Sequence, residues 1–592
     1  MERKRRISAI WIAVLLLLAL AVTAGAQEAA ECALSWTAEE GTLRLSGLLQ
    51  VQDPAFCIAS VYRKNGQMVS VGIECVPEGA DELTLSLPES MALEEYTMRV
   101  YLTDARHRPV CAAQVWNCRS VAATCEKKGY TVISGTFGGT QICNFVPALG
   151  HRYGEWRVTA EPEGISCGEK ERSCRVCGSV DRAAVYPETT LPVLRLYGSL
   201  EGIDRKTEVS LQAQFDGAGQ TFAAYATLKY QGHSSTVYEK KNYTIKFFQD
   251  ETHETRLKVK FYDWNKDSKF ILKANYIDPS QCRNLVCADI WSEICKTRDG
   301  TKHIKKLFNY GAVDGLPSAV YLNDTFLGLY DLTLHKDDDL FKLKSGEQDA
   351  LMILNRCTSD AALFRAEAAF DDACDWEVEF CGTEDRAWAQ EKLNAFARFV
   401  MTASDAEFSN NKTLKKYVNI DSAVDYLLAI YALGLHNSYA KNLVLVSYDD
   451  GTGVSDPWIC SLFDMEDAFG LSPDGQRVLD AVDGLPEKTD GIWTSGTGSL
   501  LWDRLLQCYE TRIRARYTQL RAGVLSQEAI MEKVRQFTAQ IPEVYYAADA
   551  ARYPGMPQQP GGAEQQIEQY LSQRLALLDA RLLNEEAGGT EE

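Results

Sequence analysis

The sequence predicts a chain of the α+β class, in which a large mixed domain follows a β-sandwich and a small cysteine-rich module. Three observations support this prediction. Short segments with alternating apolar and polar residues fill residues 32–118, as expected for antiparallel strands with one buried face. Cysteines are closely spaced at residues 125–177. From residue 191 onward, strand-like runs come before helical ones, which is typical of a sheet-rich part joined to a larger helical part.

The first 26 residues have the features of a secretory signal peptide. Basic residues precede an apolar stretch at residues 7–22, and Ala24, Gly25 and Ala26 supply the small residues of a cleavage site. The apolar stretch is shorter than the roughly 20 residues that span a membrane. We therefore expect cleavage and a secreted, extracellular or envelope-associated protein without a transmembrane segment. An uncleaved membrane anchor is the alternative.

Length and charge limit the domain organisation and the partners. A chain of 592 residues is expected to form several domains, because single cores stop growing near ~250–300 residues. The net charge of -20 repels phosphate backbones and argues against nucleic acid as a partner. The predicted parts are an immunoglobulin-like sandwich at 27–120, a cysteine-rich module at 121–190, the α+β domain at 191–585 and a disordered tail at 586–592.

The cysteine-rich module allows two kinds of cross-link. Ten of the 18 cysteines lie before residue 180, and in an exported chain disulfides are slightly favoured. The alternative is a zinc site, because a Cys-x-x-Cys pair is a common source of tetrahedral zinc ligands. Its ligands would be Cys167, Cys174 and Cys177, with His151 or Cys143 as the fourth.

Two apolar runs in the α+β domain adjoin residues that can bind a metal. Asp464 follows the run at 458–463, and Asn442 directly precedes the run at 443–448. Kinases hold Mg²⁺ with an Asn and an Asp of this kind. We therefore predict Asn442 and Asp464 as ligands of Mg²⁺ or Mn²⁺, with Glu466 as a ligand of a second metal or a supporting acid. An acidic surface turn is the alternative, and composition alone favours it.

A strand-like run at 243–248 contains the first candidate for binding phosphate. Lys246 would project from it as the lysine of a kinase does toward the α- and β-phosphates of ATP. Lys240 and Lys241 are competing choices. A single lysine on a strand is more often simply solvated.

A glycine-containing segment and an arginine are further candidates. Gly232 permits a close approach of the backbone, so Gly232, Ser234 and Ser235 would offer N–H and hydroxyl groups to phosphates. Arg283 begins a predicted helix, where a positive charge opposes the helix dipole, so we expect it to have a specific partner. That partner is either a phosphate or a buried acid.

Five stretches of the α+β domain, taken in order, resemble the CotH kinase family. They are residues 229–235, 240–247, 273–280 with 283–284, 320–323 with 328–330, and 463–470, and the resemblance extends over about 191–583. It implies an exported, atypical protein kinase with two lobes. Such a kinase would use ATP and Mg²⁺ or Mn²⁺ to phosphorylate Ser or Thr of surface or spore-coat proteins.

One departure from this family concerns catalysis directly. Kinases carry a catalytic Asp five residues before the metal-binding Asn, and CotH-like sequences resemble that spacing. Asn437 occupies this place here, and an amide can orient a hydroxyl but cannot take its proton. Asn437 and Asp464 are thus the catalytic candidates, with the nearby His436 as a conceivable base. Gln231 also replaces a usual Arg.

These departures favour an alternative function. A catalytically impaired pseudokinase would keep the fold as a structural or binding protein at the cell or spore surface. Leu334, which stands where many family members have Glu, supports this alternative as well. The intact Asn442 and Asp464 favour the enzyme.

Overall fold

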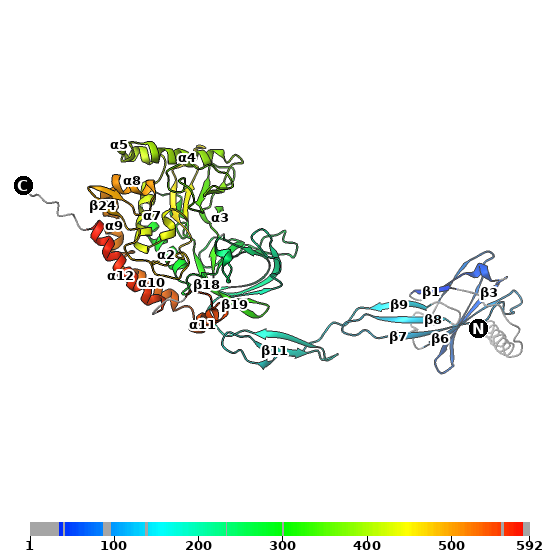
Figure 1. The fold of residues 1–592 in the computed structure, drawn as a ribbon. Coiled ribbons are helices and arrows are strands. Elements are labelled where there is room, and N and C mark those ends of the chain that lie inside the picture. The colour runs from blue at the N-terminus through cyan, green and yellow to red at the C-terminus, as the bar shows by residue number, and fades with distance from the viewer. Residues whose placement is uncertain are drawn as a thin grey trace, which may run out of the picture. The chain divides into compact units, whose positions relative to one another are not determined.

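The computed structural model describes residues 35–583 except 40–41, 52, 87–95, 136–139, 233, 299–300 and 558–561. The predicted signal peptide and C-terminal tail lie outside the described residues. The chain forms two compact units (Figure 1), residues 1–159 with 170–183 and residues 160–169 with 184–592. Within the described residues, no helix combines the length and the apolar character that crossing a membrane requires.

The first unit contains two antiparallel sheets around one core. One sheet has the order β1-β2-β5 and the other β4-β3-β6-β7-β8-β9. Leu45 and Leu85 from the first sheet pack with Val100 and Trp116 from the second, so the sheets form a sandwich, as the alternating pattern predicted. The strands are β1 (Ser35–Glu39), β2 (Thr42–Ser46), β3 (Phe56–Arg63), β4 (Met68–Cys75), β5 (Glu82–Ser86), β6 (Tyr96–Thr103), β7 (Gln114–Val121), β8 (Gly129–Gly135) and β9 (Thr140–Val146).

A small antiparallel sheet follows the sandwich in the chain. It consists of β10 (Arg157–Ala160), β11 (Gly168–Ser173) and β12 (Val180–Val185). All four residues of β10 are exposed, and no residue of β11 or β12 is fully buried. This sheet therefore has no hydrophobic core of its own.

The second unit begins with a closed β-barrel. The strand order around it is β13-β14-β15-β16-β17-β19-β18, and the only parallel neighbours among these strands, β13 and β18, close the barrel. Alternate residues such as Ile245 and Phe247 are fully buried in its core. The strands are β13 (Val193–Tyr197), β14 (Val209–Gly217), β15 (Gln220–Tyr230), β16 (Tyr243–Phe248), β17 (Lys269–Lys273), β18 (Gly315–Leu322) and β19 (Thr325–Leu334).

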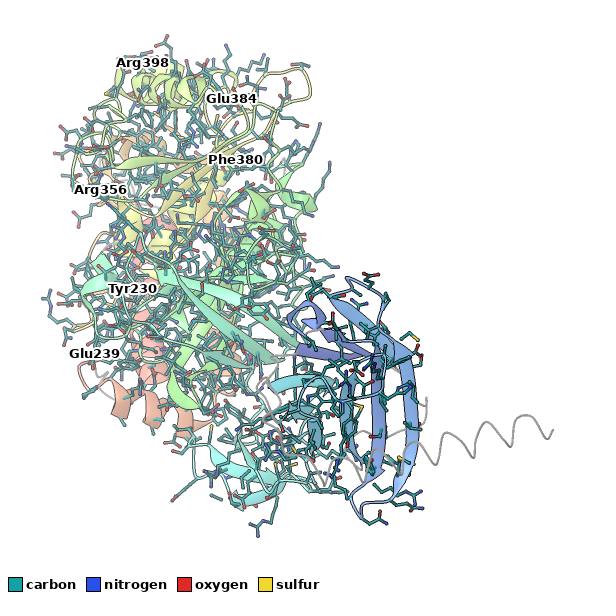
Figure 2. The ribbon with its side chains drawn as sticks, turned by 90° about the vertical axis from the view of Figure 1, so that its right-hand side faces the viewer. Tyr230, Glu239, Arg356, Phe380, Glu384 and Arg398 are labelled. Atoms are coloured by element: carbon teal, nitrogen blue, oxygen red, sulfur yellow. The ribbon has the colours of Figure 1, made fainter. Side chains whose placement is uncertain are left out.

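A second antiparallel sheet and most of the helices complete this unit. The sheet has the order β21-β20-β22-β23, with β20 (Ala350–Leu354), β21 (Trp376–Cys381), β22 (Leu443–Ser447) and β23 (Ile459–Leu462). The helix α7 (Ile420–Leu433) is buried along its length and packs on β23. In Figure 2, Tyr230 and Glu239 lie toward the barrel, whereas Phe380, Glu384 and Arg398 lie at the opposite end.

The remaining elements surround this framework. They are α2 (Arg283–Lys296), α3 (Asp338–Phe341), α4 (Ala387–Thr402), α5 (Asp405–Phe408), α6 (Asn411–Leu414), the hairpin of β24 (Glu487–Thr489) and β25 (Ile492–Thr494), α8 (Leu500–Cys508), α9 (Glu510–Arg521), α10 (Gln527–Thr538), α11 (Glu543–Arg552) and α12 (Ala563–Leu582). Short 3₁₀ turns lie at Leu48–Gln50, Ser234–Val237, Ile304–Lys306 and His436–Tyr439. Strands dominate the first part of the unit and helices the last, which confirms the α+β prediction.

Candidate functional site

Asn442 and Asp464 lie together at one edge of the second sheet, where strand β22 begins and strand β23 ends. Strands β22 and β23 are antiparallel, with Leu443 opposite Leu462, so the residue before one strand meets the residues after the other. The amide Nδ2 of Asn442 donates a hydrogen bond to the backbone oxygen of Asp464 over 3.1 Å. Because the amide nitrogen is used in this way, the side-chain oxygen of Asn442 can serve as a ligand.

Both residues have an unusual backbone conformation. Their φ angles are +59° at Asn442 and +57° at Asp464, in the left-handed region. Non-glycine residues held there cost of order 1–3 kcal/mol, and such strain is concentrated at functional sites. The surrounding hydrogen bonds must therefore hold this edge of the sheet in place.

The acids that follow β23 converge on a lysine from the barrel. Nζ of Lys273, the last residue of β17, lies 2.5 Å from Oδ1 of Asp464 and 3.8 Å from Oε2 of Glu466. The Lys273 side chain is 6% exposed, whereas those of Asp464 and Glu466 are 24% and 19% exposed. One ammonium group thus faces two partly accessible carboxyl groups.

The ionisation of these groups follows from burial and from their mutual charges. Burial alone would raise the pKa of Asp464, but the ammonium of Lys273 lowers it below its ordinary value. Burial raises the pKa of Glu466 to about 7, and the attraction of Lys273 offsets this only in part. Asp464 is therefore the firmly ionised acid of the pair.

The start of α2 holds the loop that carries these acids. The side-chain oxygen of Asn284 accepts a hydrogen bond from the backbone N–H of Met465 over 2.8 Å. Nε of Arg283 donates to the backbone oxygen of Ala468 over 2.9 Å. The guanidinium also pairs with Asp278. This loop is thereby fixed at two points by adjacent residues of one helix.

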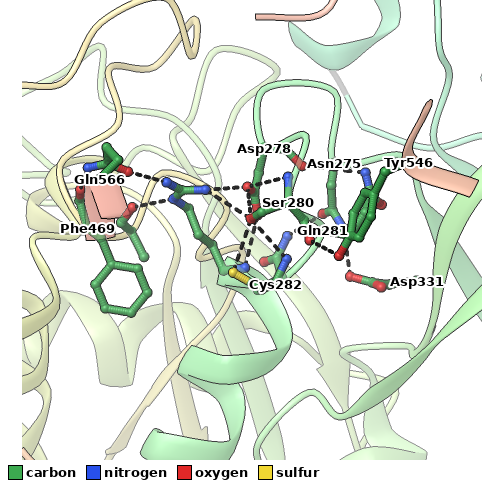
Figure 3. Close-up of polar contacts among 12 residues, drawn as sticks. Asn275, Asp278, Ser280, Gln281, Cys282, Asp331, Phe469, Tyr546 and Gln566 are labelled. Carbon is green, nitrogen blue, oxygen red and sulfur yellow. Dashed lines mark hydrogen bonds and ion pairs between the residues drawn. The ribbon is translucent and has the colours of Figure 1, made fainter. Parts of the chain in front are cut away.

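Arg283 is engaged as a structural residue. It is 0% exposed, and its guanidinium bonds Asp278, which is also 0% exposed, and Oε1 of Gln566 over 2.5 Å. In Figure 3, Gln566 and Phe469 lie on one side of the guanidinium group and Asp278 lies on the other. Of the two partners expected for Arg283, the geometry provides the buried acid.

A second buried acid lies behind Lys273. Asp331 on β19 is paired with Lys273 in the strand register, and its Oδ2 accepts a hydrogen bond from Nδ2 of Asn275 over 2.6 Å. Asn275 in turn accepts from Nδ2 of Asn284 over 2.8 Å, so Asp331 is linked to the acid-bearing loop (Figure 3). Burial raises the pKa of Asp331 to about 8, although the bond from Asn275 lowers it.

This pKa predicts a specific dependence of stability on pH. Between the ordinary value near 3.8 and the folded value of about 8, Asp331 binds more protons in the folded state than in the unfolded state. Its contribution to the free energy of unfolding is therefore complete at low pH and is lost as pH rises toward 8, by up to roughly 1.4 kcal/mol per pH unit. Asp331→Asn should flatten this fall, measured by urea unfolding at pH 5 to 8. Parallel profiles for the two proteins would contradict the assignment, and the exposed Asp372→Asn is the control.

Lys246 on β16 and Lys241 just before it, the lysines predicted to bind phosphate, are occupied elsewhere. Nζ of Lys246 lies 2.5 Å from Oε1 of Glu208, on the face of β16 opposite the barrel core. Nζ of Lys241 donates to the backbone oxygens of Thr236, over 2.8 Å, and Tyr238. The structure thus brings Lys273, rather than Lys246 or Lys241, to the acids.

The predicted glycine-containing segment is linked through Asn242 to the end of β17. The backbone N–H of Gln231 donates to the oxygen of Asn242 over 2.9 Å, and the side-chain oxygen of Asn242 accepts from the N–H of Ala274 over 2.6 Å. Gly232 has a φ of +91°, and a Cβ there would come within 2.2 Å of Oγ of Ser235, so glycine is required. Ser234 begins the turn Ser234–Val237 that follows. The ring of Tyr238 stacks on Tyr276 at 4.5 Å. Burial raises the pKa of Tyr238, and the charge of Glu466 raises it further.

Asn437 lies in a turn that is tied to the same loop. Its backbone N–H donates to Oδ2 of Asp467 over 2.8 Å, and its side chain is partly exposed. Asp467 is 0% exposed, and its Oδ1 has no partner among the described residues. Burial raises the pKa of Asp467 to about 7, and burial lowers that of His436 to about 4, with Arg574 adding to the second effect. His436 is therefore neutral and a weak base.

Lys273 and Asn284 have no role that was predicted from the sequence, although both belong to the stretches that resemble the CotH kinase family. The available clue was position, because Lys273 ends an apolar run and Asn284 follows Arg283 at a helix start. The partners of these residues are distant in the chain. Only the fold shows which lysine reaches Asp464.

Comparison with known proteins identifies the family. The family model described as CotH kinase protein matches residues 228–578, from within β15 to within α12. No curated protein matches the chain. The matched segment contains Lys273, Asn437, Asn442, Asp464 and Glu466, and it covers more than half of the 592 residues. The chain therefore belongs to the CotH kinase protein family.

Proposed function

We propose that this chain is an atypical protein kinase that transfers the γ-phosphoryl group of ATP to Ser or Thr hydroxyls of a protein at the cell or spore surface. The observation that carries the proposal is the convergence of Asp464 and Glu466 on Lys273, beside Asn442. An exported location follows from the expected signal peptide and is part of the same proposal.

The residues at this edge fit a divalent metal ion. Two carboxylates and an amide oxygen are the hard ligands that Mg²⁺ and Mn²⁺ prefer. The charges of Lys273 and Lys441 act on both carboxyl groups, and a bound cation would further favour the ionised form of Glu466, whose pKa burial raises to about 7. We propose Asn442 and Asp464 as the ligands, with Glu466 as an additional one. A bound Mg²⁺ would neutralise part of the negative charge on the phosphates of ATP.

We further propose that Lys273 contacts the phosphates of ATP. It is the buried lysine that faces the acids, as the lysine of a kinase must when nucleotide and metal share one site. The segment around Gly232 is linked through Asn242 to the residue after Lys273 and would cover the phosphates with backbone N–H groups. That Lys246 or Lys241 binds the phosphates stays a prediction from the sequence.

The chemistry then needs positioning more than proton removal. The oxygen of the acceptor hydroxyl forms a bond to the γ-phosphorus while the bond to the bridging oxygen of ADP breaks, and the hydroxyl proton passes to solvent water. Because the transition state is largely dissociative, orientation and charge stabilisation provide most of the catalysis. The partly exposed Asn437 can orient the hydroxyl.

A pseudokinase is the second candidate, and Asn437 is the observation that favours it. Asp467, the carboxyl group that is bonded to the backbone of Asn437, is fully buried. Neither residue offers an accessible base. In this case the chain would bind the nucleotide and act as a structural or binding protein.

The Asn437→Asp variant separates the two candidates. A positioned general base contributes typically 10²–10⁴-fold, so we expect Asn437→Asp to raise the rate of phosphate transfer by about a hundredfold. The assay uses the purified chain with Mg²⁺ or Mn²⁺, γ-labelled ATP and candidate surface proteins. Asn411→Asp, an exposed exchange of the same chemistry, is the control and should leave the rate unchanged.

Each outcome has a distinct meaning. Labelling by the unchanged chain supports the kinase. Metal-dependent ATP binding with labelling only in Asn437→Asp supports the pseudokinase. If neither protein binds ATP in a metal-dependent manner, both candidates are excluded.

A further inference from the structure

Four potential metal ligands converge in the first unit, whereas the proposed kinase site belongs to the second. Cys125, His151, Cys174 and Cys177 each present one ligand atom, and all four atoms lie within 4.8 Å of one another. All four residues belong to the same compact unit. They come from three separate stretches of the chain, so their convergence is a property of the fold.

The distances fit a tetrahedral zinc site better than a disulfide. Sγ of Cys125 lies 3.8 Å from Sγ of Cys174, whereas a disulfide requires about 2.05 Å. With Zn–S bonds of about 2.3 Å, the sulfurs of a tetrahedron lie about 3.8 Å apart. Sγ of Cys177 lies 3.3 Å from Nδ1 of His151, close to the roughly 3.6 Å expected for a nitrogen and a sulfur on one zinc ion.

The surrounding backbone is arranged for a thiolate at Cys174. The backbone N–H groups of Arg152 and Val176 donate to Sγ of Cys174 over 3.3 and 3.4 Å. The chain reverses directly after Cys177 through Gly178, whose φ is +76° and whose N–H donates to the backbone oxygen of Cys174 over 2.9 Å. The Cys-x-x-Cys turn is therefore closed by its own hydrogen bonds.

Further contacts bring the other two ligands to this turn. The backbone N–H of Gly150 donates to the oxygen of Cys125 over 3.1 Å, which holds the segment of His151 against Cys125. Nε2 of His151 lies 3.6 Å from a carboxylate oxygen of Glu126. A carboxylate at the second nitrogen is the usual support for a zinc-bound histidine, and it would leave Nδ1 as the ligand atom.

The small sheet next to these residues needs such a cross-link. Strand β10 is entirely exposed and β11 has no fully buried residue, but Cys125 and Cys174 are 5% and 3% exposed. Segments without a core of their own are commonly stabilised by a disulfide or a structural metal. Two of the four candidate ligands are thus buried at this turn, whereas His151 is partly exposed and Cys177 is exposed.

We propose that Cys125, His151, Cys174 and Cys177 bind one zinc ion with a structural role. The four protein ligands fill the tetrahedral positions and leave none for a substrate, which distinguishes structural from catalytic zinc. Each thiol loses its proton to water as its sulfur binds the metal.

This ligand set differs from the one expected from sequence. Cys167 belongs to the second unit, where its surroundings include the charges of Asp324 and Arg195, so it is not part of the cluster. Cys125 takes its place. The side chain of Cys143 lies outside the described residues, and His151 supplies the fourth ligand.

Metal content tests the proposal directly. The full chain, purified without chelators, should contain one zinc ion per molecule by elemental mass spectrometry. Cys177→Ser should lose it, whereas Cys75→Ser, which changes an exposed cysteine of the same unit outside the cluster, should retain it. Zinc content that is unchanged in Cys177→Ser would overturn the proposal, as would a Cys125–Cys174 disulfide detected in non-reduced peptides.

Cobalt substitution keeps the proposal testable if Cys177→Ser fails to fold. The wild-type chain loaded with Co²⁺ should show the strong visible bands of a tetrahedral cobalt–thiolate site. Cys177→His retains four ligands but exchanges one sulfur for nitrogen, so these bands should shift to shorter wavelength. A spectrum that is identical in both proteins would overturn the assignment.

Discussion

Replacing Asp464 by Asn should lower the rate of metal-dependent phosphate transfer by about a thousandfold. A metal ion stabilises the transition state by several kcal/mol, and each 1.36 kcal/mol corresponds to a factor of ten. Asn retains the size of the side chain but removes the charge that faces Lys273 at 2.5 Å. In the same variant, Mg²⁺ should no longer strengthen the binding of ATP, as measured by calorimetry with and without the metal.

The control for this experiment is Asp372→Asn, an identical exchange at an exposed position of the same unit. It should bind and transfer as the unchanged chain does. If Asp464→Asn keeps more than about a tenth of the rate, Asp464 does not hold the metal. If the unchanged chain is a pseudokinase, Asp464→Asn is introduced into the Asn437→Asp variant instead. The rate of phosphate transfer should then fall about a thousandfold relative to Asn437→Asp alone.

Replacing Arg283 by Leu should lower the free energy of unfolding by about 3–5 kcal/mol. Removing one partner of a buried ion pair leaves the other charge buried without compensation. Asp278 would be that charge, and the loop around Ala468 would lose a hydrogen bond as well. Urea unfolding followed by tryptophan fluorescence measures the change.

A comparison of three variants isolates the ion pair. Arg365→Leu, at an exposed position, should change the free energy of unfolding by no more than about 0.5 kcal/mol. The double variant Arg283→Leu with Asp278→Leu should be less destabilised than Arg283→Leu alone, because no unpaired charge remains. A loss below about 1 kcal/mol in Arg283→Leu would show that the pair contributes little to the fold.

The sequence predicted that Asn442 and Asp464 lie close together because the evidence for this is local. Asn442 and Asp464 each adjoin an apolar run, and two such runs that pair in a sheet bring their ends together. The α+β order was predictable for the same reason, since periodicity is a property of neighbouring residues.

The lysine and the zinc ligands depend on contacts between distant segments. Lys273 and Lys246 both lie on barrel strands, and only the packing of the second sheet with the barrel determines that Lys273 faces Asp464, 191 positions away in the chain. Cys125 likewise meets Cys174 over 49 positions, whereas Cys167 is nearer in sequence but lies in the other unit. Local spacing contains no information about such pairs.

The left-handed backbone at Asn442 and Asp464 restricts how this edge can evolve or be redesigned. Besides glycine, Asn and Asp are the residues that best tolerate positive φ angles. Glu, Gln and His are equally good donors to metals, but at these two positions they would add backbone strain. A library that randomises both positions should therefore return chiefly Asn, Asp and Gly among its folded members. The backbone conformation thus limits the residues that these positions accept, whether or not a metal binds there.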